Sequence, residues 1–367
     1  MNLALHTTIC DRFRAEVPIF GFAHSLEVVA AVTEAGGIGI WGATRNTPEE
    51  IIDGLAWLRD RLGDAPFGID LVLPSGMPER DDRAALEAQI PNHHTSFVAS
   101  LRAKYGVPDD GLPGTRSRFV RSQQMADRQL RAVLDSEVPI LAMGVGSPAA
   151  AVQGAKDRGK CVVALVGAPK HARSAVESGA DILVAQGYDA GAHTGEIGTF
   201  SLAPQIIAQA GDVPVVVAGG VGCGSQVAAA LALGAVGVWL GTAWLFTKEH
   251  ATHPVVLDKL IRASSSDTTR LRADSGKTLR QIKTAWSDEW ERPTAPTPLK
   301  MPYQDILVGD FLGAVERHEI EPLLKSEAGQ SVGFFNELTT VADVIARLTG
   351  EADDALAALT RRSSVQV

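Results

Sequence analysis

The sequence has few cysteines, no excess of positive charge and no long apolar run, and each shortage excludes a class of protein. Its three cysteines, Cys10, Cys161 and Cys223, share no metal-ligand spacing and cannot all pair. A disulfide-stabilised fold is therefore not expected, and a reducing cytoplasm fits best. The formal net charge of −9 argues against nonspecific binding to nucleic acid or to an anionic membrane surface.

Segments that would direct the chain to or through a membrane are also missing. No apolar run approaches the roughly 18 residues of a membrane span. The first residues lack the basic region and apolar stretch of a signal peptide, so we expect a soluble cytoplasmic protein. Hydrophobic residues make up 45% of the 367 residues, which is enough for a substantial core.

What the sequence does contain is a regular alternation of short apolar runs with helix-like segments. Eight runs can be counted, at residues 18–22, 38–41, 67–73, 138–143, 161–166, 181–185, 213–218 and 236–240. Strands that alternate with helices imply parallel crossovers, and eight such units close a (β/α)8 barrel. We predict this TIM barrel. A doubly wound open sheet is the alternative, because periodicity alone does not show closure.

The alternation lapses twice, and each lapse predicts an addition to the barrel. Residues 75–136, after the third strand, are polar and helix-prone and too many for an ordinary loop, so we expect a helical insertion that acts as a lid or substrate domain. Residues 264–367 form a C-terminal extension expected to pack partly on the barrel. The barrel itself would comprise residues 1–74 and 137–263.

Within the extension, the sequence favours loops and short helices. Residues 264–266 and the proline-rich residues 293–302 are expected to be loops around short helices. Residues 323–348 are expected to be helical again, with a break near Gly329.

Glycines follow the last two apolar runs at the point where each strand should end. Gly219 and Gly220 follow residues 213–218, and Gly241 and Thr242 follow residues 236–240. Glycines between a strand and a helix let backbone amides approach an anion at the helix N-terminus. Two successive strand ends of this kind are typical of the phosphate site of a TIM barrel. The alternative is that these glycines only turn the chain.

The densest polar cluster, residues 186–195, follows the sixth run. It contains three glycines and cannot be a helix interior. His193 is the only residue there that exchanges a proton near neutral pH, and the loop lies where barrel enzymes place catalytic groups. Gln186 offers a donor and an acceptor to the edge of a planar heterocycle. Alternatively, His193 only braces the loop.

These motifs resemble those of the nitronate monooxygenases, formerly called 2-nitropropane dioxygenases. The resemblance rests on Ala-Gln-Gly-x-x-Ala-Gly-x-His-x-Gly around His193, on Pro-Val-Val-Val-Ala-Gly-Gly-Val, and on Ala-Leu-Ala-Leu-Gly-Ala-x-Gly-Val-x-Leu-Gly-Thr before residue 243. Shorter supporting motifs are Ala35-Gly-Gly-Ile-Gly39, Phe67-Gly-Ile69, Ser275-Gly-Lys277 and Ala328-Gly-Gln330. The similarity spans most of the chain except the insertion, and it implies a TIM barrel that binds FMN without a covalent link.

The resemblance also implies roles for individual residues. His193 matches the family's catalytic histidine, the base that takes the α-proton of a nitroalkane or steadies the nitronate. Residues expected at the FMN are Gly21, Phe22, Asp70, Gln186 and Gly191 near the ring system or its side chain, and Gly219, Gly220, Gly241 and Thr242 at the phosphate. Trp239 and Leu240 are also expected to contact the cofactor. His24 and Tyr188 are the candidate substrate residues.

Two positions depart from the family pattern on the flavin face. Residues 21–25, Gly-Phe-Ala-His-Ser, replace Ala-Pro-Met-Ala-Gly, and Asp70 replaces an asparagine. A buried carboxylate at residue 70 must be paired or protonated. His24 is either a second active-site histidine or the start of the first barrel helix.

The reaction implied is the oxidation of alkyl nitronates or nitroalkanes by O2 to a carbonyl compound and nitrite. One alternative on the same fold is an NAD(P)H-dependent reductase of quinones or enoyl thioesters, although no G-x-G-x-x-G unit follows a strand. The other is a flavin- or phosphate-binding barrel without catalysis. We expect no metal site, including at His93-His94, and read Cys223 as a packing residue. A homodimer is left open.

Overall fold

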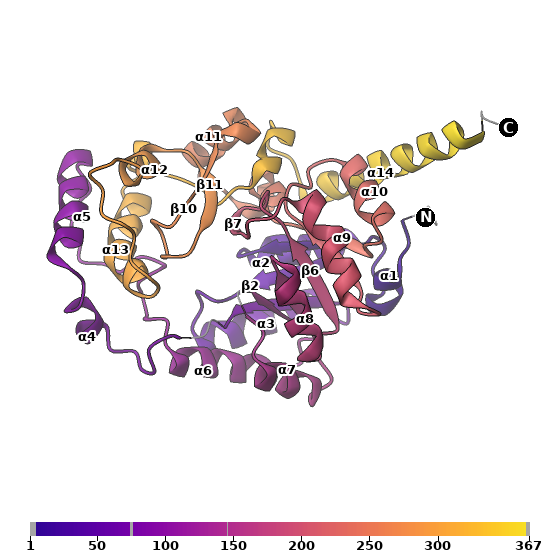
Figure 1. The fold of residues 1–367 in the computed structure, drawn as a ribbon, viewed down its shortest axis with the longest axis horizontal. Coiled ribbons are helices and arrows are strands. Elements are labelled where there is room, and N and C mark those ends of the chain that lie inside the picture. The colour runs from indigo at the N-terminus through magenta and orange to yellow at the C-terminus, as the bar shows by residue number, and fades with distance from the viewer. Residues whose placement is uncertain (1–4, 74–75, 145, 365–367) are drawn as a thin grey trace.

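The computed structural model describes residues 5–73, 76–144 and 146–364, and its centre is a closed barrel of eight parallel strands (Figure 1). The strand order around the barrel is β1-β2-β3-β4-β5-β6-β8-β9, with β9 pairing back on β1. Closure confirms the predicted TIM barrel and excludes the open sheet. The barrel strands are β1 (Ile19–Ala23), β2 (Ile38–Gly42), β3 (Phe67–Val72), β4 (Ile140–Gly144), β5 (Cys161–Val166), β6 (Ile182–Gln186), β8 (Val215–Ala218) and β9 (Gly237–Leu240).

The barrel strands are apolar on both faces because each face packs against protein. Side chains such as Phe20, Ile40 and Val184 fill the interior, while the alternate residues pack against the surrounding helices. Helix α1 (Thr8–Phe13) adds Ile9 and Phe13 to the interior cluster, and the Phe13 ring meets Phe20 edge-on at 6.2 Å. This helix closes the amino end of the barrel, so the open end is the one at which the strands finish.

Seven helices surround the barrel, and the one after β2 begins at a clear sequence signal. Thr47 caps the helix after β2 and forms a capping box with Glu50, as expected for Thr-Pro-Glu-Glu. The helices around the barrel are α2 (Leu26–Glu34), α3 (Pro48–Leu62), α6 (Gln123–Leu134), α7 (Ala149–Lys156), α8 (Pro169–Glu177), α9 (Thr199–Ala210) and α10 (Gly224–Ala232).

The segment between β3 and β4 contains two kinds of helix. α6 packs against α3 and β3, in the position of a barrel helix. α4 (Arg83–Glu87) and α5 (Asn92–Tyr105) instead contact α13 (Tyr303–Arg317) in the C-terminal extension. The predicted boundary between barrel and insertion, at residues 74 and 75, lies outside the described residues, and the division into barrel, insertion and extension stays a prediction.

The C-terminal extension holds more regular structure than its sequence suggests. β10 (Thr268–Leu271) and β11 (Leu279–Ile282) form an antiparallel hairpin, and β11 also pairs with β7 (Ala192–His193). The remaining helices are α11 (Pro254–Arg262), α12 (Ala285–Trp290), α13 and α14 (Val341–Ser364), the last of which packs against α10 and α2. In Figure 1, α4, α5, α12 and α13 form a lobe beside the barrel.

The expected helix over residues 323–348 is wrong in its first half. Residues 321–323 and 330–334 form 3-10 turns, and α14 begins only at Val341. The backbone between the turns is held by the barrel instead, because the Gly329 N–H donates to Thr242 Oγ1 at 2.8 Å and the Gln330 N–H to the Asp189 carbonyl at 2.9 Å. These tertiary hydrogen bonds override local helix propensity.

No helix among the described residues is long and apolar enough to cross a membrane. Nor does the described part of the chain contain a group of three metal-ligating side chains, so neither His93 nor His94 belongs to such a group.

Candidate active site

The polar loop after β6 lies at the open end of the barrel and is held as a short strand. Its residues Ala192 and His193 form β7, which pairs with β11 so that His193 lies opposite Leu279. Gln186, at the tip of β6, donates from Nε2 to the His193 carbonyl at 3.0 Å. The backbone of His193 is therefore fixed by a barrel strand on one side and by the C-terminal hairpin on the other.

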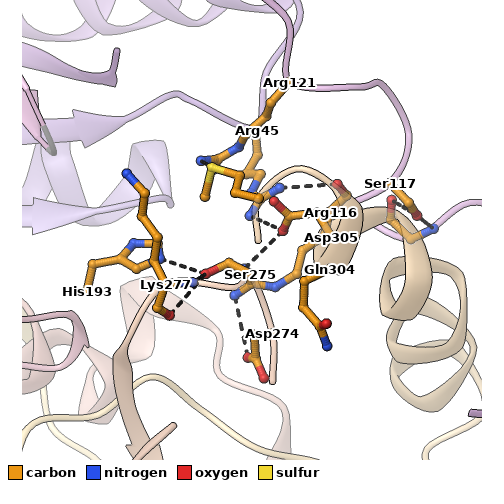
Figure 2. A network of polar contacts seen from close by, with 12 residues as sticks. Arg45, Arg116, Ser117, Arg121, His193, Asp274, Ser275, Lys277, Gln304 and Asp305 are labelled. Atoms are coloured by element: carbon orange, nitrogen blue, oxygen red, sulfur yellow. Dashed lines mark hydrogen bonds and ion pairs between the residues drawn. The ribbon is translucent and has the colours of Figure 1, made fainter. Parts of the chain in front are cut away.

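The His193 imidazole is neutral and has a defined partner. Its Nε2 lies 2.8 Å from the Oγ of Ser275, which is fully buried (Figure 2). Burial, together with the positive charges of Arg121 and Arg116, lowers the pKa of His193 to about 3. One ring nitrogen remains for a substrate, as an acceptor if Nε2 carries the proton and as a donor if Nδ1 carries it.

An aromatic wall forms another part of the open end. The rings of Phe22 and Trp239 stack at 6.1 Å, and the His24 ring meets Phe22 edge-on at 5.4 Å. His24 Nδ1 lies 2.6 Å from the Gly42 carbonyl, and a Cβ at Gly42 would overlap both Phe22 and His24. His24 precedes the N-cap of α2, Ser25, and is exposed, while desolvation by surrounding protein is the main cause that lowers its pKa. An exposed yet desolvated side chain lines a concave surface, which favours a role at the site.

Asp70 is buried and has no ion-pair partner in the part of the chain that the structure describes. Its position on β3 places it on the inward face, two residues after Gly68, and the side chain is 5% exposed. Its Oδ1 has no hydrogen-bond partner among the described residues, and burial raises the pKa of the carboxyl to about 7. Of the two expected outcomes, the protonated one is therefore favoured. A protonated carboxyl has one donor and one acceptor, as the amide of asparagine has.

The two glycine turns have the geometry of an anion cradle. Gly219 and Gly220 adopt φ angles of +97° and +78°, which residues other than glycine rarely adopt. The N–H groups of Gly220, Val221 and Gly241 have no acceptor among the described residues. An added Cβ at Gly241 would meet nothing closer than 4.0 Å, so the backbone is open there. These features fit a phosphate group.

Three other predicted cofactor residues, Gly21, Gly191 and Leu240, could contact a ligand at the open end of the barrel only through their backbone. A Cβ at Gly21 would lie 2.5 Å from Val32 on α2, and Leu240 packs in the apolar cluster outside the barrel. Gly191 allows close approach of residues 327–329, because its Cβ would lie 2.3 Å from the Glu327 carbonyl oxygen. The role of each residue at a cofactor stays a prediction.

The predicted substrate residue Tyr188 is engaged by the C-terminal hairpin. The guanidinium carbons of Arg270 and Arg280 lie 4.2 and 4.6 Å from its ring centroid. Hydrogen bonds to these arginines are the main cause of a lowered pKa of the tyrosine.

Several charged residues at the open end were not foreseen. Figure 2 shows Lys277 beside His193, with Arg45, Arg116, Arg121, Asp274 and Asp305 around them. Arg45 pairs with Asp305 at 3.3 Å, and burial lowers the pKa of Arg45 to about 9. Two features of the sequence could have predicted some of these residues. Arg45 comes shortly after the end of a barrel strand, and the motif that supported the family resemblance contains Ser275 and Lys277.

Sequence comparison connects this site to known proteins. A family model described as "Nitronate monooxygenase" matches residues 13–351. The chain is 37% identical over 371 residues to "Putative monooxygenase Rv1533" of Mycobacterium tuberculosis, covering 97% of this chain and 98% of that protein. It is 28% identical over 351 residues to "Probable nitronate monooxygenase" of Bacillus subtilis, covering 92% and 94%.

Two solved structures are similar to this chain over nearly its whole length. The chain is similar to nitroalkane oxidase from Streptomyces ansochromogenes, with a TM-score of 0.80, 27% identity and coverage of 96% of this chain and 99% of that one. FabK from Thermotoga maritima is similar with a TM-score of 0.75, 27% identity and coverage of 97% and 99%. The chain is an enzyme that belongs to the nitronate monooxygenase family.

Proposed function

We propose that this enzyme is an FMN-dependent monooxygenase that oxidises alkyl nitronates with O2 to carbonyl compounds and nitrite. The observation that carries the proposal is a neutral, positioned imidazole, His193, at the same end of the barrel as two glycine turns whose backbone N–H groups have no acceptor within the described ranges. The imidazole suits a small anionic substrate, and the N–H groups of the glycine turns suit the phosphate of a cofactor.

FMN would be held at both ends by groups that this chain presents. The N–H groups of Gly220, Val221 and Gly241 would donate to the phosphate. Trp239 and Phe22 offer an apolar wall, and the Asp70 carboxyl, in its protonated form, would supply the donor and acceptor that an amide would supply. FMN, when bound, supplies the electron transfer between the substrate and oxygen.

The pKa of His193 bears on which form of the substrate is used. A carbon acid is deprotonated most effectively by a base whose pKa lies near the working pH, and a pKa of about 3 is far below it. A nitronate has already lost its α-proton. We therefore favour the nitronate over the neutral nitroalkane. Ser275 Oγ–H would donate to Nε2, so that Nδ1–H donates to a nitronate oxygen and steadies its charge.

The products define a stoichiometry that can be measured. One O2 supplies the carbonyl oxygens of two nitronate molecules, and each nitrogen leaves as nitrite with its two oxygens, so the atoms balance without another reductant. We expect FMN-loaded enzyme given an alkyl nitronate to release about two nitrites per O2 consumed, without accumulation of H2O2. An oxidase would release one nitrite and one H2O2 per O2. A nitrite electrode or dye assay with an oxygen electrode, with and without catalase, separates the two outcomes.

A further inference from the structure

The turn between β8 and α10, residues 219–223, is covered by the C-terminal extension. Phe334 lies over Gly222, where an added Cβ would come within 2.6 Å of the phenyl ring. The next residue, Phe335, is buried and stacks on Phe246 with ring centroids 5.2 Å apart, which anchors this segment in the core. The turn proposed to hold the FMN phosphate is therefore not shaped by the barrel alone.

Helix α14 holds the same turn with a pair of opposite charges. The Gly224 N–H, in the first turn of α10, donates to Glu351 Oε2 at 2.7 Å. Glu351 Oε1 pairs at 3.1 Å with Arg347, one helical turn earlier on α14. Arg347 also donates from Nη2 to the Gly222 carbonyl at 3.2 Å. The two side chains thus fix the directions of one carbonyl and one N–H group that are two residues apart.

Helix α14 also lies directly against the backbone at the start of α10 (Figure 1). A Cβ at Gly224 would overlap the backbone of Leu348 and Ala352, which are themselves fully buried. Only glycine allows this close approach of two backbones. A shift of α14 would therefore move the Gly224 N–H and, with it, the turn.

The turn after β9 is tied to the same extension. The Gly329 N–H donates to Oγ1 of Thr242, which is buried. This bond uses the hydroxyl oxygen of Thr242 as an acceptor, so its O–H can still donate to a phosphate oxygen. Both turns expected at the phosphate therefore depend for their shape on residues 329–351.

We propose that Glu351 and Arg347 are positioning residues that set the affinity for the FMN phosphate through the turn after β8, not through contact with the cofactor. Backbone N–H groups bind a phosphate well only when they point to one place. Docked α14 would supply that order before FMN binds, and such preorganisation lowers the free-energy cost of binding. By linkage, FMN should in turn stabilise the docking of α14. The inference rests on the FMN binding in the proposed function and not on the substrate.

The charge of Glu351 distinguishes positioning from simple electrostatics. A carboxylate that contacts the phosphate turn repels a phosphate, so charge alone predicts that removal of Glu351 tightens FMN binding. Positioning predicts the opposite for Glu351→Ala, because alanine offers no acceptor to the Gly224 N–H. Glutamine keeps an acceptor oxygen without the charge, so Glu351→Gln should bind FMN at least as tightly as the parent.

Titration of the flavin-free full chain with FMN and with riboflavin, followed by flavin fluorescence, tests the proposal. Riboflavin has the same ring system and lacks the phosphate. We expect Glu351→Ala to weaken FMN binding about 10-fold and to leave riboflavin binding unchanged, whereas Glu351→Gln should retain both affinities. Gly350→Ala is the matched control, because residue 350 is exposed on the same helix and an added Cβ there would meet nothing within 4 Å.

Hydrogen exchange measures the reciprocal effect in the parent chain. FMN should slow the exchange of the backbone amides of residues 345–352, and riboflavin should not. Equal protection by both flavins, or by neither, would contradict the coupling.

Three results of the titration would overturn the proposal. They are equal FMN affinity in the parent and Glu351→Ala, tighter FMN binding by Glu351→Ala, and an equal loss of affinity for FMN and riboflavin. If Glu351→Ala does not fold, Arg347→Met tests the same contact from a partly exposed position. Any of these results with nitrite release by the FMN-loaded parent would refute this inference alone. The expected affinities without nitrite release would refute only the proposed reaction, and a parent chain that binds no FMN would refute both.

Discussion

Replacing His193 by alanine should lower nitronate turnover by about 100-fold or more while FMN stays bound. The reason is that the imidazole is the group proposed to meet the substrate, whereas the cofactor is expected to be held by the glycine turns and the aromatic wall. Nitrite release per bound FMN is the appropriate measure, because it corrects for any loss of cofactor. An exposed histidine on α8, His171, provides the matched control, and His171→Ala should retain full turnover.

The variant His193→Asn separates the two roles that the imidazole could have. Asparagine keeps an N–H donor but cannot act as a base. If His193 steadies the nitronate by donating a hydrogen bond, the asparagine variant should recover part of the activity lost in His193→Ala. Equal inactivity of both variants would favour proton abstraction instead. Turnover of His193→Ala at the parent rate would show that His193 only braces its loop.

Replacing Asp70 by asparagine should stabilise the protein, and more strongly as the pH rises. The folded-state pKa of about 7 exceeds the ordinary value of 3.8, so the folded state retains a proton that the unfolded state releases between these values. The contribution of Asp70 to stability is therefore present below pH 3.8 and is lost as the pH rises through about 7. A pKa rise of this size corresponds to about 4 kcal/mol of stability lost at high pH. The gain from Asp70→Asn should be smaller than this by the cost of an unsatisfied buried amide.

Urea unfolding of the parent and of Asp70→Asn at pH 5 and pH 8 measures this effect. We expect a gain of about 2–4 kcal/mol in the free energy of unfolding at pH 8, and a clearly smaller gain at pH 5. Asp135→Asn, at an exposed position paired with Arg158, should change stability by less than about 1 kcal/mol at either pH. An equal effect of Asp70→Asn at both pH values would mean that residue 70 is already charged at pH 5.

The barrel could be predicted from the sequence because each of its strands and helices has a pattern within a short stretch of residues. Each strand is a short run that is apolar on both faces, and most of them are followed by a helix, which in some cases begins at a clear cap such as Thr47. The glycine turns after β8 and β9 and the loop of His193 follow directly from strand ends. Their positions needed only the rule that the strands of a parallel barrel finish at the same end.

The charged half of the site could not be predicted in the same way, because it is assembled from distant segments. Arg45 follows β2, Arg121 lies in the segment between β3 and β4, and Asp305 lies on α13, more than 180 residues after Arg121. No local pattern states that these segments meet. The hairpin of β10 and β11 escaped prediction for a related reason, since β11 is completed by pairing with β7, a two-residue strand.

Anaerobic mixing of the FMN-loaded enzyme with an alkyl nitronate and, separately, with NADPH tests the central claim most directly. The proposed function requires that the nitronate alone bleaches the visible absorbance of the flavin rapidly and that admission of O2 restores it with release of nitrite. NADPH should bleach the flavin slowly or not at all. Rapid bleaching by NADPH with none by the nitronate would contradict the proposal and favour the reductase, and a protein that takes up no FMN would refute both enzymatic alternatives.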